Sequence, residues 1–228
     1  DMQAVAERTS FVSGLPAEGD NAGGDPGPFT AFGIFLGIQA AAKFKLGRDS
    51  MDGVHVAIQG TGSVGGRLAR LLAKDGAKLT LADIDADGAN DLASELGAEI
   101  VSTDEIMQVE CDVFSPNALG GVLDDASIAA LRSPIVAGGA NNQLARPEHG
   151  KLLAQREILY APDYVINAGG IISVASEYFA KTENREVDVA EVRERIAEIP
   201  GRLVSIWEEA ASSDRTSAEI ADARKILQ

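Results

Sequence analysis

Short apolar segments alternate with longer amphipathic segments along most of the chain. From position 55 onward there are six such apolar segments, and the start of each is typical of a buried strand: HVAIQG, KLTLAD, AEIVS, CDVFSP, PIVAGGAN and ILYAPD. Helical spacing follows over Ser63–Lys74 and Ala86–Leu96, which should stop near Gly76 and at Gly97. Apolar strands that alternate with helices predict an α/β fold, a doubly wound (Rossmann-like) parallel sheet with helices on both faces.

Helical patterns flank this alternating region on both sides. The segment PFTAFGIFLGIQAAAKFKLG predicts a helix that begins near Pro28 and ends at Gly47. After Gly170 the pattern is helical to the end of the sequence, and we expect these C-terminal helices to pack on the sheet domain. Pro200 should kink or break the longest amphipathic segment, VDVAEVRERIAEIPGRLVSIWEEAASS.

The chain divides into a leading segment and one domain. Residues 1–27 contain the stretch AEGDNAGGDPG, whose Gly, Pro and Asp residues predict a loop. Residues 28–228 hold all the predicted strands and the helices between and after them. A chain of 228 residues is long enough for one large domain with a core of useful size.

Charge and composition exclude several classes of function. The 35 acidic and 20 basic residues give a net charge of −15, which disfavours a nucleic acid or an anionic membrane surface as a partner. We expect no apolar run long enough to span a bilayer and no signal peptide. The single cysteine, Cys111, excludes an internal disulfide, and its apolar neighbours predict a core position. A cytoplasmic protein fits these features.

A glycine pattern follows the first predicted strand. Gly60, Gly62 and Gly65 form G-x-G-x-x-G between that strand and the helix that opens at Ser63. In this context the pattern predicts a dinucleotide site, in which Gly60 permits the tight turn, Gly62 lets the backbone approach a pyrophosphate, and Gly65 allows close packing of helix on strand. The N–H groups around Ser63 and Val64 would face the anion.

An acidic residue completes the fingerprint and selects the nucleotide. Asp83 stands 18 positions after Gly65, at the end of the second strand, where its carboxylate can accept hydrogen bonds from both ribose hydroxyls. A 2′-phosphate there would meet like charge, and no arginine follows in DIDADGAN. The sequence therefore favours NAD over NADP, and residues 28–228 become an NAD-binding domain. A ligand-free glycine turn or a methyltransferase-like nucleotide site is the alternative.

Three later stretches, FSPNALGG, AGGANNQL and INAGGIISVA, follow strands of the second half of the sheet. Ligands bind at the carboxyl ends of parallel strands, small residues let a flat ring approach, and an Asn side chain suits a carboxamide. For Asn141 and Asn142, turn capping is an equally good explanation when each is taken alone. Together the three stretches favour a binding site.

Other reactive side chains have simpler explanations. His55 lies inside the first strand and fits a core or edge position, whereas His149 is expected on the surface. Trp207 should pack in the last long helix. The acidic residues show no spacing typical of a metal site.

Several motifs carry a family resemblance. GDPGPFTAFGIFLGIQAAAK, VAIQGTGSVGGRLARLL, ECDVFSPNALGG, VAGGANNQL and LYAPDYVINAGGIISVASE resemble, in this order, the glutamate/leucine/phenylalanine/valine dehydrogenase family, and its leucine, phenylalanine and valine branch in particular. The resemblance implies oxidation of an L-amino acid by NAD and water to a 2-oxo acid, ammonia and NADH. It also implies a homo-oligomer in the intact protein.

The resemblance assigns roles to individual positions. It places Asn167 near both the nicotinamide and the substrate, and Ile171 and Val174 in the pocket for the substrate side chain. Asn117 is a departure, because a cysteine is frequent at this position of the family. The remaining positions would line the cofactor site: Thr30, Gly62, Ser63, Val64, Asp83, Ala118, Ala140 and Asn141.

The largest departure is a missing motif. The family's catalytic lysines lie in a glycine-rich motif of a separate upstream domain, and this sequence has no GGGKGG-like stretch, so we expect no catalytic residue in this chain. Lys43 and Lys45 lie on an amphipathic helix and fit surface positions. The chain therefore resembles the cofactor half of an amino-acid dehydrogenase, with a stand-alone NAD-binding module as the alternative. The intact INAGGIISVA stretch favours the dehydrogenase.

Overall fold

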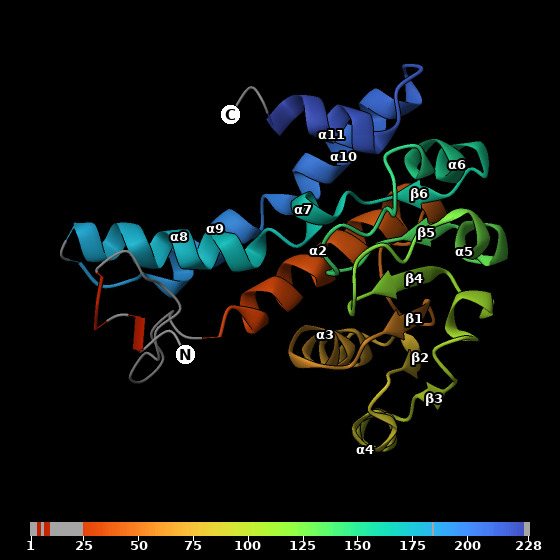
Figure 1. The fold of residues 1–228 in the computed structure, drawn as a ribbon, viewed down its shortest axis with the longest axis horizontal. Coiled ribbons are helices and arrows are strands. Elements are labelled where there is room, and N and C mark those ends of the chain that lie inside the picture. Colours follow the sequence, from red (N-terminus) through yellow and green to blue (C-terminus); the bar gives the residue numbers. More distant parts are fainter. Residues whose placement is uncertain (1–3, 6, 10–24, 184, 226–228) are drawn as a thin grey trace.

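A computed structural model describes residues 4–5, 7–9, 25–183 and 185–225 (Figure 1). Within these residues six parallel strands form one sheet in the order β3-β2-β1-β4-β5-β6, so strand addition reverses at the β1/β4 boundary. This order confirms the doubly wound parallel sheet, and its switch point is where such sheets bind ligands. The strands are β1 His55–Gln59, β2 Lys78–Ala82, β3 Glu99–Ile100, β4 Val113–Pro116, β5 Ile135–Val136 and β6 Leu159–Tyr160.

Helices cover both faces of the sheet, as the alternating pattern predicts. The helices are α2 Gly27–Leu46, α3 Ser63–Lys74, α4 Ala86–Leu96, η1 Ile106–Gln108, α5 Asp125–Ala130, α6 His149–Gln155, α7 Asp163–Ile166, α8 Gly169–Thr182, α9 Val189–Ile196, α10 Ile199–Ala211 and α11 Ser217–Lys225. The bounds of α3 and α4 match the expected segments.

Two apolar cores lie on opposite faces of the sheet because side chains alternate along each strand. In β1, Val56 and Ile58 join the core beneath α2, α3 and α4, whereas Ala57 joins the core under η1, α5 and α6. Cys111 is buried in this second core, as expected, and burial raises the pKa of its thiol to about 11.

The long helix α2 crosses the first face and contacts α3, α8 and α10. Pro28 stands in its first turn and Gly47 ends it with φ 68°, so both predicted ends are confirmed. By length and composition α2 is long and apolar enough to cross a membrane. This corrects the expectation that no apolar run reaches such a length. Its apolar side chains include Ile34 and Ile38, which are fully buried against its neighbours.

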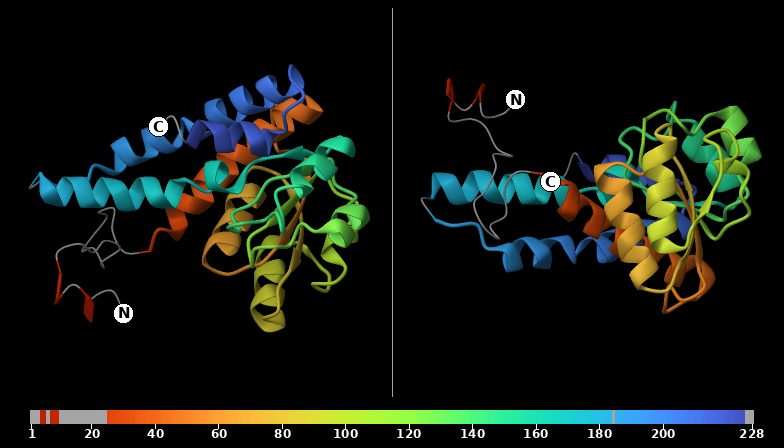
Figure 2. Two further views of the ribbon diagram at one scale, coloured as in Figure 1. Left: turned by 45° about the horizontal axis from the view of Figure 1, so that its top comes forward. Right: turned by 90° about the horizontal axis from the view of Figure 1, so that it is seen from below.

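The C-terminal helices pack on α2 and extend beyond the sheet. α8 and α9 lie side by side and project away from the strands (Figures 1 and 2). Pro200 stands in the first turn of α10, and the helical segment is interrupted between α9 and α10, as predicted. Trp207 of α10 is 2% exposed and donates its indole N–H to the carbonyl of Tyr160 at 3.0 Å, so it holds α10 against the end of β6.

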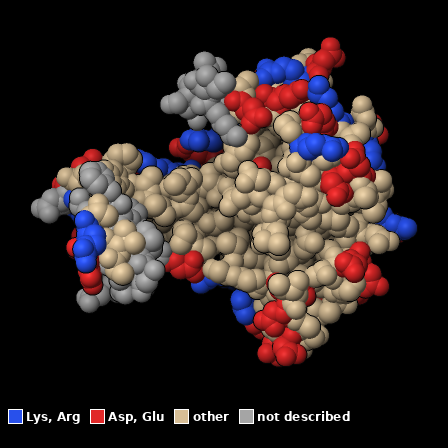
Figure 3. Space-filling view, in the orientation of Figure 1, with Lys and Arg blue, Asp and Glu red and all other residues tan. Residues whose placement is uncertain are grey.

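Charged side chains gather around the rim of the face seen in Figure 3. The middle of this face, over α2, α7 and the end of β4, is almost free of lysine, arginine, aspartate and glutamate. On this face, charged side chains of both signs therefore lie mainly at the rim.

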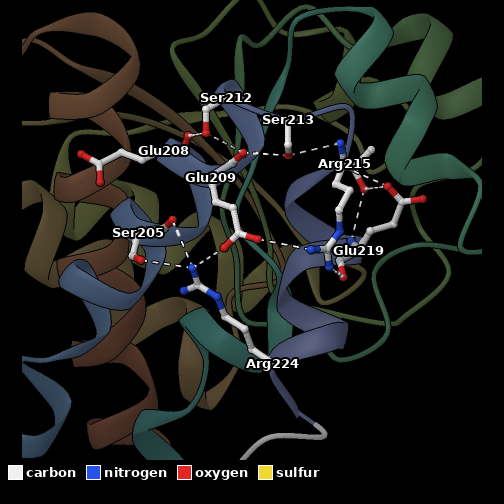
Figure 4. Close-up of polar contacts among 9 residues, drawn as sticks. Ser205, Glu208, Glu209, Ser212, Ser213, Arg215, Glu219 and Arg224 are labelled. Atoms are coloured by element: carbon white, nitrogen blue, oxygen red, sulfur yellow. Dashed lines mark hydrogen bonds and ion pairs between the residues drawn. The ribbon is translucent and has the colours of Figure 1, made fainter.

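A polar network joins α10 to α11 (Figure 4). Glu209 accepts from Arg224 at 2.7 Å and from Arg215 at 3.2 Å, and Arg224 also donates to the Ser205 hydroxyl at 3.2 Å. These groups are about one-third to one-half exposed, so their contribution to stability is modest.

One expectation about local structure is wrong. His149 is not a surface residue: its side chain is 1% exposed, and its Nδ1 accepts the N–H of Arg146 at 3.0 Å, in the turn that precedes α6. After β6 the chain forms the short helix α7 and then a turn at Asn167 and Ala168. Of the leading segment, residues 1–3, 6 and 10–24 lie outside the described residues, and the boundary near residue 27 stays a prediction.

Candidate cofactor site

The glycine turn leaves an open position in front of α3. Gly60 has φ 93°, and a Cβ atom there would lie 2.8 Å from the amide nitrogen of Ala118. A Cβ at Gly65 would collide with the carbonyl of Gly60, so α3 packs directly on the turn. A Cβ at Gly62, in contrast, would meet nothing within 4 Å. The two outer glycines are needed by the fold, and the space at Gly62 suits a ligand that approaches the backbone.

Asp83 lies beside this turn at the end of β2. Its Oδ2 accepts the N–H of Thr61 at 2.5 Å and the Thr61 hydroxyl at 3.1 Å, and its Oδ1 accepts the N–H of Asp85 at 3.0 Å. Partial burial alone would raise the pKa of Asp83, but the hydrogen bonds from Thr61 and Asp85 outweigh it and hold the pKa below its ordinary value. The carboxylate is therefore ionised at neutral pH and keeps free acceptor capacity for hydroxyl groups.

The first turn of α3 meets a second acidic residue. Asp25, just before α2, accepts the Ser63 hydroxyl at 3.1 Å and pairs with Arg67 at 2.9 Å. The pKa of Asp25 is lowered, first by the hydrogen bond from the N–H of Gly27, and further by Ser63 and Arg67. A carboxylate thus lies at the helix start where a pyrophosphate is expected.

Asparagine side chains connect the three strand-end loops. Asn117, after β4, accepts the N–H of Gly139 at 2.9 Å, in the loop after β5. Asn167, after α7, donates to the carbonyl of Gly139 at 3.2 Å and to the side-chain oxygen of Asn141 at 2.7 Å. Three segments far apart in sequence therefore form one polar surface at the carboxyl edge of the sheet.

The loop after β5 is also held by hydrogen bonds from the buried Gln143 and to Asp163. Gln143 is buried and donates to the carbonyls of Gly138 and Ala140 at 2.7 and 3.0 Å. Asn142 has φ 53°, a left-handed conformation, and its N–H donates to Asp163 at 2.6 Å. Asn142 is therefore held through its backbone N–H, whereas Asn141 bonds through its side chain to Asn167.

The other expected site residues lie around the same edge. Thr30 is in the first turns of α2, where its hydroxyl donates to Pro26 at 3.0 Å and would be close to a Cβ at Gly170. Ala118 is exposed next to Gly60, and Ala140 is buried in the loop after β5. Ile171, 65% exposed, and Val174, half-buried, lie on α8 just beyond Asn167.

The structure adds residues to this edge that the sequence analysis missed, and it places two lysines away from it. Asp25, Asp163 and Gln143 belong to this edge, and sequence analysis gave none of them a role there. The GDPGPF and APDY stretches hold both carboxylates, but only the fold shows which loops they contact. Lys43 and Lys45 lie at the far end of α2, roughly 20 Å along the helix from Thr30, and both are exposed. Within the described ranges no three His, Cys, Asp or Glu side chains are grouped to hold a metal ion.

Comparison with known proteins decides the family. The family model described as Glutamate/Leucine/Phenylalanine/Valine dehydrogenase matches residues 85–228. The chain belongs to this family. A leucine dehydrogenase from Thermoactinomyces intermedius is 46% identical over 192 residues, which cover 84% of this chain and 52% of that protein. A phenylalanine dehydrogenase from the same organism is 40% identical over 223 residues, covering 97% of this chain and 59% of that protein.

Solved structures agree with this family. The crystal structure of L-tryptophan dehydrogenase from Nostoc punctiforme is 34% identical, with a TM-score of 0.85 over 97% of this chain and 61% of that chain. A hetero-hexameric glutamate dehydrogenase from Thermus thermophilus, 22% identical with a TM-score of 0.68 over 88% of this chain and 52% of that chain, shares the fold. The chain spans about half the length of the curated relatives it matches. Dehydrogenases of this family use NAD or NADP.

Proposed function

We propose that this chain is the cofactor-binding part of an NAD-dependent amino-acid dehydrogenase. The intact protein would convert an L-amino acid of the leucine, valine or phenylalanine type to a 2-oxo acid and ammonia. The observation that carries the proposal is the space in front of Gly62 beside the ionised Asp83. A dinucleotide fits there, because its pyrophosphate needs backbone without a side chain and its ribose needs acceptors.

The same two features support NAD rather than NADP. Three donors already occupy part of the Asp83 carboxylate, and the remaining lone pairs suit ribose hydroxyls. A 2′-phosphate would add negative charge beside a carboxylate that stays ionised. No positive charge stands in the stretch that follows, since residues 84–91 contain no lysine or arginine.

The strand-end loops supply the other end of the proposed site. Ala118, Ala140 and Asn141 would line the cofactor site, with Asn167 near the nicotinamide, and NAD, when bound, supplies the hydride acceptor. Asn167, Ile171 and Val174 would contact the amino-acid substrate. The low-charge surface over α7 and the end of β4 supports an apolar substrate side chain (Figure 3). A homo-oligomer in the cytoplasm is part of the same proposal, from the family resemblance.

The test is a pair of fluorescence titrations of this chain with NADH and NADPH. We expect NADH to bind at least about tenfold more tightly, since one well-placed like charge costs on the order of 1.4 kcal/mol. Asp83→Ser should reduce this difference in affinity, because it removes an acceptor for the ribose of NADH and the charge that repels the 2′-phosphate of NADPH. Asp87→Ser removes the same charge from the first turn of α4 and serves as the matched control. Equal or tighter binding of NADPH by the unchanged chain would overturn the NAD proposal.

A cofactor-binding module without catalysis is the second candidate. For the 228-residue chain taken alone, the absence of a GGGKGG-like stretch favours it. Amino-acid oxidation by a longer protein that contains this chain would decide for the enzyme.

A further inference from the structure

A buried carboxylate lies outside the residues so far given a role in the cofactor site. Asp163 is the first residue of α7, directly after β6, and is 9% exposed. It is the one Asp or Glu among the buried side chains of the part of the chain that the structure describes. Burial of a carboxylate is costly unless donors compensate it, so its partners indicate what it does.

Both carboxylate oxygens of Asp163 have donors. Oδ2 accepts the N–H of Asn142 at 2.6 Å, and Oδ1 accepts the Tyr160 hydroxyl at 3.2 Å. Burial, and then the charge of Asp163, raise the pKa of Tyr160, so the phenol stays protonated and donates. The Asn142 bond is the short, charge-assisted one, and it joins α7 to the loop after β5.

The Asn142 bond sets the shape of that loop. Asn142 has φ 53°, a conformation that costs free energy for a residue with a side chain. The neighbouring Asn141 bonds to Asn167, and the N–H of Asn167 donates to the carbonyl of Asp163 at 2.9 Å. Asp163 therefore touches both segments whose asparagines meet at the edge of the sheet.

We propose that Asp163 is a positioning residue that holds the Asn141–Asn167 pair in place for the nicotinamide half of the cofactor, through its bond to the N–H of Asn142. The inference rests on the proposed function, since it assumes that a dinucleotide binds along this edge. The glycine turn and Asp83 belong to other loops, and within the described residues no hydrogen bond joins them to Asp163. We therefore expect the adenosine half of the site to depend on this carboxylate less than the nicotinamide half does.

The experiment compares two ligands that differ by the nicotinamide. NADH and ADP-ribose are titrated against the unchanged chain, Asp163→Ala, Asp163→Asn and Tyr164→Phe. Asp163→Ala should weaken the affinity for NADH at least about tenfold, because the N–H of Asn142 loses its acceptor and the loop after β5 loses its bond to α7, while the affinity for ADP-ribose changes less than about twofold. Asp163→Asn keeps an acceptor oxygen but loses the negative charge, so the affinity for NADH should fall by only about threefold and that for ADP-ribose should not change. Tyr164→Phe removes a hydrogen bond from the same helix to Asp222 (2.7 Å) and should leave both ligands unchanged.

Each outcome decides the inference. Equal weakening of NADH and ADP-ribose by Asp163→Ala would mean a general role in folding, and no weakening of NADH would mean no role; both overturn the proposal. If Asp163→Ala does not fold, Asp163→Asn decides, because a selective loss of NADH of about threefold supports the proposal and an unselective change or none contradicts it. Failure of the proposed function is distinct, because the unchanged chain would then bind neither ligand.

Discussion

The glycines of the turn between β1 and α3 have different roles, which the structure distinguishes. Gly62 faces open space, so Gly62→Val should abolish NADH binding while the midpoint of thermal unfolding shifts by only a few degrees. Gly65→Ala should instead destabilise the fold, by about 1–3 kcal/mol, because its Cβ meets the Gly60 carbonyl. NADH titration and thermal unfolding of both variants check the contrast. Binding by Gly62→Val within a few-fold of the unchanged chain would show that the turn is not the pyrophosphate site.

Asp25 brings a negative charge to the start of α3, where the proposed cofactor brings another. Because its pKa is lowered by the Gly27 N–H and by Ser63 and Arg67, it is ionised throughout pH 5–8 and repels a pyrophosphate there. We expect Asp25→Asn to tighten NADH about two- to fivefold at low salt and less at high salt, as for other charges near a helix end.

The matched control for Asp25 is Asp49→Asn, which removes an exposed acidic partner of Lys43 at the far end of α2 and should leave NADH affinity unchanged. Weaker binding by Asp25→Asn would mean that Asp25 aligns Ser63 and Arg67 for the cofactor instead of competing with it.

At the scale of elements, periodicity and end signals predict most of the fold correctly. α3 and α4 begin and end where their apolar spacing and glycines indicate, and Pro200 separates α9 from α10 because proline lacks the N–H that a continuous helix needs. The errors arise where long-range contacts decide. His149 is buried because the turn before α6 needs an acceptor, and no local pattern shows that need.

The candidate site likewise has parts that local sequence predicts and parts that only long-range contacts determine. The glycine turn and Asp83 are consecutive with their strands, so sequence spacing finds them. The bonds from Asn117 to Gly139 and from Asn142 to Asp163 join residues more than 20 positions apart, and only the sheet order brings them together. Sequence analysis therefore identified the loops of the site but not the carboxylates that hold or oppose it.

Trp207 is the largest of the side chains that attach α10 to the rest of the domain. Trp207 is buried and bonded to the carbonyl of Tyr160, so Trp207→Ala should destabilise the protein by about 3–5 kcal/mol and Trp207→Phe by less. Urea unfolding followed by circular dichroism measures both, because Trp207 is the single tryptophan and its fluorescence is lost in the variants. NADH affinity of folded Trp207→Phe should be unchanged. A cost below about 1 kcal/mol for Trp207→Ala would contradict this anchoring role.

At the scale of the whole molecule, a site that binds a cofactor differs from a site that turns over a substrate. The 228-residue chain carries the glycine turn, Asp83 and the three connected loops, yet it spans about half the length of its curated relatives. Hydride transfer needs substrate and cofactor held in a closed cleft, and proton transfer needs a positioned base. The described lysines of α2 lie at the wrong end of that helix for this purpose.

We therefore predict that this chain alone binds NADH and does not oxidise leucine, valine or phenylalanine. Loss of a general base alone lowers a rate by roughly 10²–10⁴-fold, and loss of substrate positioning lowers it further, so NADH production should be undetectable in a standard absorbance assay. The NADH titration is the control for a folded site, since a chain that binds nothing would make the activity result meaningless. A longer protein that contains this chain together with a lysine- and glycine-rich domain should be active under the same conditions. Robust turnover by the 228-residue chain would mean that its own side chains supply the base, and Lys43 and Lys45 would be the first to replace with glutamine.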